Sequence, residues 1–420
     1  YAKETRPASS VFVDLTKEPY SAKRGTDITS VLQRAIDDIA PTGGTVYLPA
    51  GAYCVEGHID LRAGVELRGS TPSAHVDVFL YPVGAGGTYT EGGTNPYKEA
   101  GTVIYTDFGA NDPDGKEFIS MYEGSGLVGL SIEYDRQVSS KIIPHSFTVR
   151  GHGKNIYICE IGMSSAWNSI DLASERCDGH YVEFVWGVGL NEGISVGAGS
   201  EGGIIRDCHF TVNCWQIGRY RDGNYWNNVE AVATMYGKTF NVGQSRGEVL
   251  YNNFSINQLR GISILNGARD VLSVGTAVDY SDCDLYLSGD CNATVVNGQF
   301  VSARSSTSQW VLQSYVYADS DFTGKAVLCN SAFWGSASPV LKIKGSGTVS
   351  MLNTAYDATK SNLCVLEGGS AFFATVVSSK GGNISVSGSD AGAALGITAV
   401  PPSMKLTSTG LLPADRVSFK

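Results

Sequence analysis

The chain has 420 residues, with 51 glycines, 13 prolines, 17% charged residues and a formal net charge of -10. This negative charge disfavours nucleic acid and anionic membranes as partners. The excess of glycine over proline favours many tight turns over disordered linkers. No apolar run reaches the about 18 residues that a transmembrane helix needs, so we expect no membrane span.

Residues 26–40 are the first predicted element, an amphipathic helix. Thr26 or Asp27 can cap its start. Its apolar residues fall on one face, namely Ile28, Val31, Leu32, Ala35, Ile36 and Ile39. Because the end of a stacked fold exposes an unpaired apolar cross-section, we expect this helix to cover one end of the repetitive fold that follows.

The segment after this helix runs from Gly43-Gly44-Thr45-Val46-Tyr47-Leu48-Pro49 to Tyr53 and leads to Val65-Glu-Leu67-Arg-Gly69. The pattern, over about residues 10–70, resembles the opening of the pectate-lyase-like β-helix superfamily. The resemblance implies a right-handed parallel β-helix. It implies little about activity, because one fold hosts many functions.

Residues 72–101 follow, rich in glycine, proline and tyrosine and without strand periodicity. We interpret them as an insertion that lines a binding site, since long loops without secondary structure are uncommon unless they are functional.

An apolar-x-apolar triplet then recurs about once every 21–25 residues. The triplets are Phe147-Thr-Val149, Ile170-Asp-Leu172, Ile194-Ser-Val196, Trp215-Gln-Ile217, Phe240-Asn-Val242, Ile262-Ser-Ile264 and Leu285-Tyr-Leu287. Such a period is typical of stacked units, and no coil shows apolar residues at helical spacing. The sequence therefore predicts an all-β chain, a right-handed parallel β-helix with an N-terminal capping helix.

A second insertion, residues 218–227, interrupts the coils after Ile217. Later coils are expected at 340–343, 364–366 and 384–386, and residues 401–420 are interpreted as a C-terminal strap. We expect a single domain over residues 1–420. Among the nine cysteines, Cys159 and Cys208 are expected to be buried thiols, while Cys283 and Cys291 are close enough in sequence to pair.

The middle residue of each triplet points outward, because side chains alternate along a strand. The expected outward row is Thr148, Asp171, Ser195, Gln216, Asn241, Ser263 and Tyr286. Asp171 is its only carboxylate, and Asp178 follows seven residues later, across a turn. The two could face each other across a shallow groove, although aspartate also commonly only hydrogen-bonds turns.

A pair of carboxylates is the minimal machinery for glycoside hydrolysis, so Asp171 and Asp178 are the candidate catalytic residues. Other residues are candidates for binding a sugar, because aromatic faces stack on sugar rings and polar groups orient hydroxyls. These are Arg150, His152, Trp167, Gln216, Arg219, Tyr220 and Trp226. Trp215 is expected to point into the core. We expect no cofactor and no metal.

The Ile-Asp-Leu triplet followed by Cys177-Asp-Gly-His-Tyr-Val182 resembles glycoside hydrolase family 136, the lacto-N-biosidases, over about residues 125–230. The resemblance implies a retaining mechanism in which Asp171 is the acid/base and Asp178 the nucleophile, with release of lacto-N-biose from oligosaccharides. It also implies a helical accessory domain or folding subunit, which this chain lacks beyond its capping helix. We expect an extracellular or cell-surface bacterial protein.

Other functions stay open. Gly151-His152-Gly153 matches one element of polygalacturonases, but the accompanying Asp-Asp and Arg-Ile-Lys elements are missing. A polysaccharide lyase would need a cation, and Asp279, Asp282 and Asp284 could bind Ca²⁺, although a solvated turn is the expected alternative. A fructan-type glycosyltransferase with an Asp/Glu pair and a non-catalytic carbohydrate-binding solenoid are the remaining alternatives.

Overall fold

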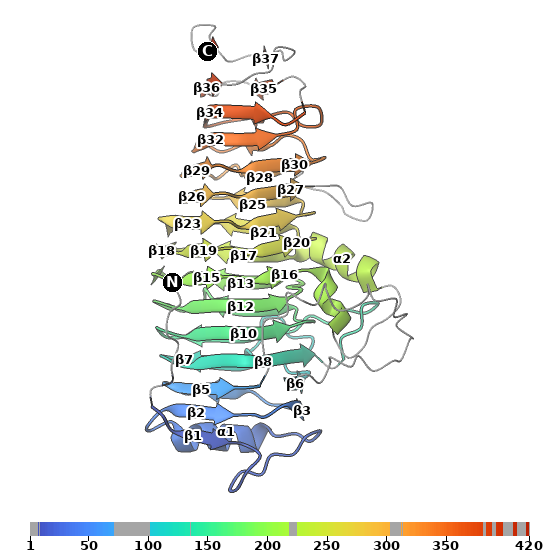
Figure 1. The fold of residues 1–420 in the computed structure, drawn as a ribbon, viewed down its shortest axis with the longest axis vertical. Helices are drawn as coiled ribbons and strands as arrows, with labels where there is room; N and C mark the ends of the chain where they lie inside the picture. Colours follow the sequence, from blue (N-terminus) through green and yellow to red (C-terminus); the bar gives the residue numbers. More distant parts are fainter. Residues whose placement is uncertain are drawn as a thin grey trace. The chain divides into compact units, whose positions relative to one another are not determined.

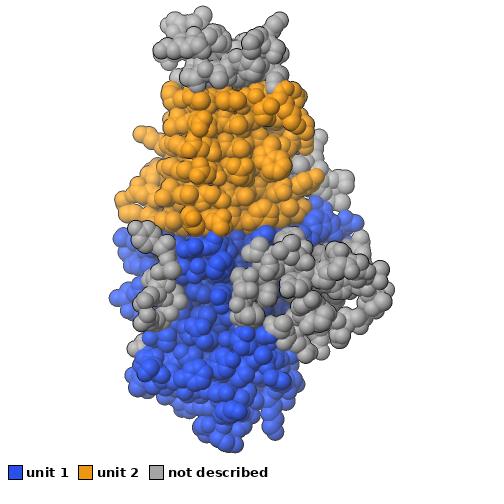
Figure 2. Space-filling view, in the orientation of Figure 1, with its two compact units in different colours: residues 1–233 blue, residues 234–420 orange. Residues whose placement is uncertain are grey.

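A computed structural model describes residues 7, 9–70, 101–134, 136–217, 225–302, 312, 314–380, 384–388, 392–397, 406–409 and 417–419. The chain divides into two compact units, residues 1–233 and 234–420 (Figure 2). Within each unit, short parallel strands stack coil upon coil (Figure 1). The predicted all-β parallel β-helix is therefore confirmed, whereas a single domain over residues 1–420 stays a prediction.

Unit 1 holds α1, β1 to β16, a 3₁₀ helix and the start of α2. Their bounds are β1 Phe12–Asp14, α1 Thr29–Ile39, β2 Gly44–Tyr47, β3 Gly51–Cys54, β4 Ile59–Leu61, β5 Val65–Arg68, β6 Thr102–Thr106, β7 Ile119–Tyr122, β8 Gly126–Tyr134, β9 Phe147–His152, β10 Tyr157–Met163, β11 Asn168–Leu172, β12 Tyr181–Gly187, β13 Glu192–Val196, β14 Ser200–Glu201, β15 Ile204–Arg206, β16 His209–Phe210, the 3₁₀ helix Val212–Ile217 and α2 Tyr225–Tyr236.

Unit 2 holds the strands from β17 onward. Their bounds are β17 Lys238–Val242, β18 Ser245–Arg246, β19 Val249–Tyr251, β20 Phe254–Ile256, β21 Arg260–Ile264, β22 Ala268–Arg269, β23 Val271–Val274, β24 Ala277–Asp279, β25 Cys283–Leu287, β26 Asn292–Val296, β27 Gln299–Ser302, β28 Ser314–Ala318, β29 Lys325–Cys329, β30 Ala332–Gly335, β31 Leu341–Ile343, β32 Thr348–Tyr356, β33 Cys364–Leu366, β34 Ser370–Ser378, β35 Ile384–Gly388, β36 Gly392–Ile397, β37 Leu406–Thr409 and β38 Val417–Phe419.

Stacked apolar side chains form the core of each unit. In unit 1, Val149 pairs with Ile170 and Ile170 with Ile194, and all three are fully buried. In unit 2, Phe240, Ile262 and Leu285 form the equivalent ladder. Each such side chain contributes about 1.5–3 kcal/mol by leaving water. The triplets identified in the sequence therefore supply the core, with the two exceptions described below.

The predicted capping helix is confirmed as α1. Its apolar face is buried at Leu32, Ala35, Ile36 and Ile39. The Asp27 carboxylate accepts the Thr29 N–H at 3.0 Å at the start of the helix. Gln33 fixes α1 to strand β4, because its side-chain amide donates to the Asp60 carbonyl at 3.1 Å and its oxygen accepts the Asp60 N–H at 2.9 Å.

Two predictions of local structure are wrong. The Trp215-Gln-Ile217 triplet is part of the 3₁₀ helix Val212–Ile217 and not a strand, and α2 is a helix where only an insertion was expected. Helical spacing of Trp226, Val229 and Ala233 explains α2, since these side chains pack against one hydrophobic cluster. Trp215 lies in the same cluster and is 2% exposed, so its predicted core position is correct.

The insertions and the tail are described only in part. Residues 72–100 and 218–224 lie outside the described residues. The later coils appear as β31, β33 and β35, as predicted. Within residues 401–420, β37 pairs with β35 and β38 pairs with β36, both in parallel, so these segments extend the ladders where a strap was expected.

The cysteines are all free thiols, so Cys283 and Cys291 do not pair. Cys159 and Cys208 are buried, as predicted, and burial raises the pKa of the Cys208 thiol. No disulfide therefore contributes to the stability of this fold.

Asp284 on β25 is a buried carboxylate in unit 2. It is fully buried, and neither of its oxygens has a hydrogen-bond partner. Burial, together with the nearby charges of Asp279 and Asp282, raises the pKa of Asp284 well above its usual range. Asp282 is 1% exposed as well. The expected solvated turn at Asp279, Asp282 and Asp284 is therefore wrong, because Asp282 and Asp284 are both buried and Asp284 lies within β25.

We expect Asp284→Asn to stabilise unit 2 at neutral and alkaline pH. The folded pKa lies above the unfolded value near 3.8, so the folded state holds the proton more tightly. The carboxyl group of Asp284 therefore contributes a stability that is complete below the unfolded pKa and is lost as the pH rises through the folded pKa. At pH 8 the free energy of unfolding of the variant should exceed that of wild type by about 1 kcal/mol or more. Urea unfolding of both proteins at pH 5 and pH 8 checks this. A difference in unfolding free energy between variant and wild type that is no larger at pH 8 than at pH 5 would contradict the prediction.

Candidate active site on the outer face of β4, β7, β9, β11 and β13

A row of polar side chains crosses the outer face of five neighbouring strands of unit 1. Asp60 on β4 lies opposite Ser120 on β7, and Ser120 lies opposite Arg150 on β9. Arg150 lies opposite Asp171 on β11, and Asp171 opposite Ser195 on β13. We call these five residues the polar row. Successive members lie on strands about 4.8 Å apart, close enough for direct contact.

Arg150 stands in the polar row where the sequence predicted Thr148. Val149 pairs with Ile170, where the aligned triplets predicted that Phe147 would do so. The register of β9 is therefore shifted by two residues from the predicted one. Gly151 then takes an inner position, where a β-carbon would approach Leu172 to 2.7 Å. Thr148 is buried beside Tyr134 and donates to the Asn168 carbonyl at 3.0 Å. In unit 2, Asn241, Ser263 and Tyr286 pair as predicted.

Asp171 is a buried carboxylate held by several donors. Its Oδ2 accepts from Arg150 Nε at 2.7 Å and from Ser174 Oγ at 2.5 Å. Its Oδ1 accepts the backbone N–H groups of Ala173 and Ser174 at 2.8 and 2.9 Å. The side chain is 3% exposed. Asp171 must release one of these donors to take up a proton from a reacting group.

Glu117, just before β7, is a second buried carboxylate of this face, and sequence reasoning missed it. Arg150 Nη1 donates to its Oε2 at 2.8 Å, and Ser120 donates to its Oε1. Burial acts to raise the pKa of Glu117, but the hydrogen bonds from Ser120 and His152 and the charge of Arg150 outweigh burial and hold this pKa at about 2. One guanidinium on β9 therefore joins two buried carboxylates, one from each of the two coils that flank its own.

His152 extends the contacts from Glu117 toward solvent. Its Nε2 lies 2.9 Å from Glu117 Oε1, and its Nδ1 lies 2.8 Å from Glu175 Oε1. Its ring stacks on Tyr122, with centroids 5.5 Å apart. The Glu175 side chain is 56% exposed. The structure thus brings Arg150, His152 and Asp171, three residues singled out in the sequence, into one network with Glu117 and Glu175.

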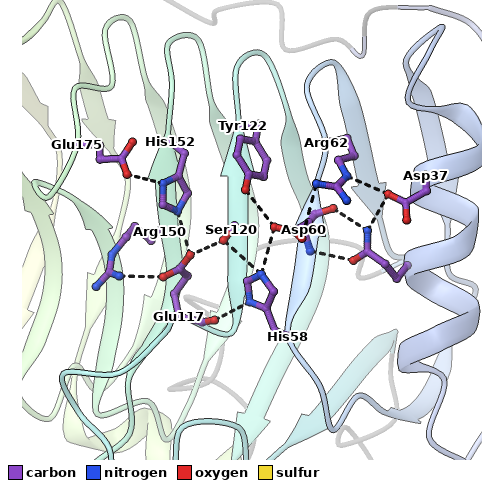
Figure 3. A network of polar contacts seen from close by, with 11 residues as sticks. Asp37, His58, Asp60, Arg62, Glu117, Ser120, Tyr122, Arg150, His152 and Glu175 are labelled. Carbon is purple, nitrogen blue, oxygen red and sulfur yellow. Dashed lines mark hydrogen bonds and ion pairs between the residues drawn. The ribbon is translucent and has the colours of Figure 1, made fainter.

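The network continues toward α1 (Figure 3). Tyr122 donates to Asp60 Oδ1 at 3.1 Å. His58 lies 3.2 Å from the same oxygen and 2.8 Å from the Glu117 carbonyl. Arg62 pairs with Asp37 of α1 at 2.9 Å. An unbroken series of polar contacts therefore spans the face from the capping helix to β9.

Asp178 lies beyond the turn that follows β11, and it has different partners from Asp171. Arg176 Nε lies 2.9 Å from both of its oxygens, and the Glu201 N–H donates to Oδ1 at 2.9 Å. Partial burial acts to raise the pKa of Asp178, but the hydrogen bonds from Arg176 and Glu201 outweigh it and lower this pKa. The side chain is 36% exposed. That Asp171 and Asp178 face each other across a groove stays a prediction.

The predicted aromatic residues Trp167 and Trp226 pack against the same hydrophobic cluster, and neither belongs to the polar row. Both are partly buried against the hydrophobic cluster that contains Trp186, Trp215 and Val229. Gln216 belongs to the 3₁₀ helix and not to the outward row, and its side chain is not among those described. Arg219 and Tyr220 lie outside the described residues. A sugar-binding role for these five residues stays a prediction.

Close packing explains the two glycines of the Gly151-His152-Gly153 motif. A β-carbon at Gly151 would approach Cys177 Sγ to 2.7 Å, and one at Gly153 would lie 3.0 Å from the Glu123 backbone nitrogen. Both glycines thus allow close contact with neighbouring coils, which explains the motif without a catalytic role.

In the described parts of the chain, no three histidine, cysteine, aspartate or glutamate side chains form a group that could hold a metal ion, and Asp279, Asp282 and Asp284 do not form one. In the same parts of the chain, no helix has the length and apolar character needed to cross a membrane.

The comparisons with known proteins agree with this architecture. Residues 21–79 match the family model described as rhamnogalacturonase A/epimerase, pectate lyase-like. No curated protein sequence matches the chain.

Among solved structures, the Dettilon tailspike protein is 11% identical with a TM-score of 0.57, over 89% of this chain and 68% of its own. DFA-IIIase from Arthrobacter chlorophenolicus A6, without its lid and in complex with GF2, is 12% identical with a TM-score of 0.55, over 98% and 99%. PfbA, a surface adhesin of Streptococcus pneumoniae, is 13% identical with a TM-score of 0.50, over 96% and 92%. The likenesses support the resemblance noted in residues 10–70, and none of them points to glycoside hydrolase family 136. The chain therefore has the right-handed parallel β-helix fold of pectate-lyase-like proteins.

Proposed function

We propose that this protein is a glycan-active enzyme that hydrolyses glycosidic bonds on the outer face formed by β7, β9, β11 and β13. One observation carries the proposal: two buried carboxylates, Glu117 and Asp171, share Arg150 on this face, and the ionised Asp178 follows one turn later. Glycosidases need at least two carboxylates beside the scissile bond. A fold shared with a DFA-IIIase in complex with GF2 is compatible with carbohydrate chemistry but shows the fold alone.

The finer proposal is a retaining, lacto-N-biosidase-like reaction. Asp178 has a lowered pKa and is partly exposed, which suits a nucleophile that must be ionised to attack C1. Asp171 would give a proton to the leaving oxygen as the C1–O bond breaks. Water would then release the sugar from Asp178 while its proton returns to Asp171. The substrate would be an oligosaccharide containing lacto-N-biose.

The charge of this face favours a hydrolase over a polysaccharide lyase. A lyase must neutralise the carboxylate of a uronic acid, usually with a free cation. Here Arg62, Arg150 and Arg176 are each paired with protein carboxylates. A non-catalytic carbohydrate-binding role is the second candidate, because the β-helix of the adhesin PfbA also resembles this chain. A fructan-type glycosyltransferase is a further alternative on the same fold.

The proposal extends to partners and location. A lacto-N-biosidase-like enzyme would act outside the cell or at its surface, on glycans that it meets there. It would also require a helical accessory domain or folding subunit, supplied separately from the described part of the chain.

Product analysis after incubation with lacto-N-tetraose tests the finer proposal. We expect wild type to release lacto-N-biose and lactose. Cleavage of other neutral oligosaccharides without this release would keep a glycosidase and contradict the lacto-N-biosidase assignment. Cleavage of oligogalacturonate with an unsaturated product would instead support the lyase, and binding without any cleavage would support the carbohydrate-binding solenoid.

A further inference from the structure

Two buried carboxylates, those of Asp171 and Glu117, hold the guanidinium of Arg150 from two sides. Its Nε contacts Asp171 at 2.7 Å and its Nη1 contacts Glu117 at 2.8 Å. Both carboxylates are nearly fully buried, with side chains 3% and 4% exposed, whereas Arg150 is 22% exposed. A planar guanidinium that is fixed at two of its nitrogens has a defined orientation for the third.

The third nitrogen of this guanidinium, Nη2, makes no hydrogen bond or ion pair with a described residue, and the guanidinium carbon lies 5.7 Å from the centroid of the Phe147 ring. Its two N–H groups are donors without an acceptor on a partly exposed side chain. An uncharged oxygen, such as a sugar hydroxyl or ring oxygen, fits this donor. An anionic group fits less well, because the charge of Arg150 is already paired with the side chains of Glu117 and Asp171.

We infer that Glu117 is a positioning residue, which together with Asp171 clamps Arg150 so that Nη2 receives an uncharged oxygen of the substrate. This inference rests on the proposed function, because it names the substrate contact of the same face. Glu117 itself is buried behind Arg150, Ser120 and His152 and acts through Arg150. The low pKa of Glu117 keeps the clamp charged throughout the physiological range.

The clamp can be tested without any substrate by nuclear magnetic resonance of arginine side chains. In wild type at pH 5, we expect separate, slowly exchanging Nε–H and Nη–H signals from Arg150. In Glu117→Gln the Nη signals should broaden or merge, while thermal unfolding stays cooperative. Glu123→Gln is the matched control, because Glu123 pairs with the exposed Lys154. Equal Arg150 signals in wild type and Glu117→Gln would overturn the clamp. Absence of separate Nη–H signals from wild type would overturn it as well. If Glu117→Gln does not fold, the wild-type spectrum alone decides whether Arg150 is clamped.

The positioning role has its own readout once a substrate is found with the lacto-N-tetraose assay or its neutral alternatives. Glu117→Gln should lower kcat about 100-fold, the effect of displacing an orienting group by about 1 Å, with a smaller change in KM. An unchanged kcat would overturn the positioning role. Absence of cleavage by wild type would speak against the proposed function, while the Arg150 signals would still decide the clamp.

Discussion

Asp178→Asn is expected to abolish glycan cleavage and to leave the fold intact. Asparagine cannot form the covalent glycosyl intermediate that we propose for Asp178, so the rate should fall at least about 1,000-fold. The fold should tolerate the change, because Asp178 and its partner Arg176 are both partly exposed. Initial rates at saturating oligosaccharide, together with the melting temperature, measure the two effects separately.

Asp270→Asn is the matched control for this variant. Asp270 is also an exposed aspartate paired with an exposed arginine, Arg246, at 3.0 Å, but it lies in unit 2. Its rate should equal that of wild type. If Asp178→Asn kept more than about one tenth of the wild-type rate, Asp178 could not be the nucleophile.

Arg150→Gln is expected to give the largest loss of stability. Removing the guanidinium leaves Glu117 and Asp171 buried without their shared cation. Loss of one partner from a buried ion pair costs about 3–5 kcal/mol, whereas exposed pairs contribute little. For a unit of this size, such a loss lowers the melting temperature by roughly 6 °C or more.

Arg176→Gln is the control for this loss of stability, because Arg176 also pairs with an aspartate but is 54% exposed. It should unfold at the wild-type temperature. A fall of less than about 1 kcal/mol for Arg150→Gln would show that water or neighbouring donors replace the guanidinium, and the clamp would then not hold as described.

The stacked core could be predicted from the sequence because each triplet repeats the same local rule. Ile170, Ile194 and Ile262 each alternate with a polar residue, and all three are buried in parallel ladders. Register was harder to predict. Phe147-Thr-Val149 satisfies the rule, and Val149-Arg-Gly151 does so too if glycine can take an inner position. The observed pairing uses the second triplet, and Gly151 leaves room there for Leu172.

Part of the site could not be predicted, for physical reasons. Glu117 lies outside every triplet, in the turn before β7, and its importance arises from Arg150 and His152, which are more than 30 residues away in sequence. No local pattern marks such a residue. The start of α2 could have been found, because Trp226, Val229 and Ala233 are spaced for one helical face.

A crystal structure of Asp178→Asn with the oligosaccharide that wild type cleaves would show whether the substrate binds on this face. We expect a sugar on the outer face of β7, β9, β11 and β13, with an oxygen within hydrogen-bond distance of Arg150 Nη2 and a C1 atom beside residue 178. Sugar bound elsewhere, with this face empty, would contradict the proposed active site and would leave the polar row with a role in stability alone.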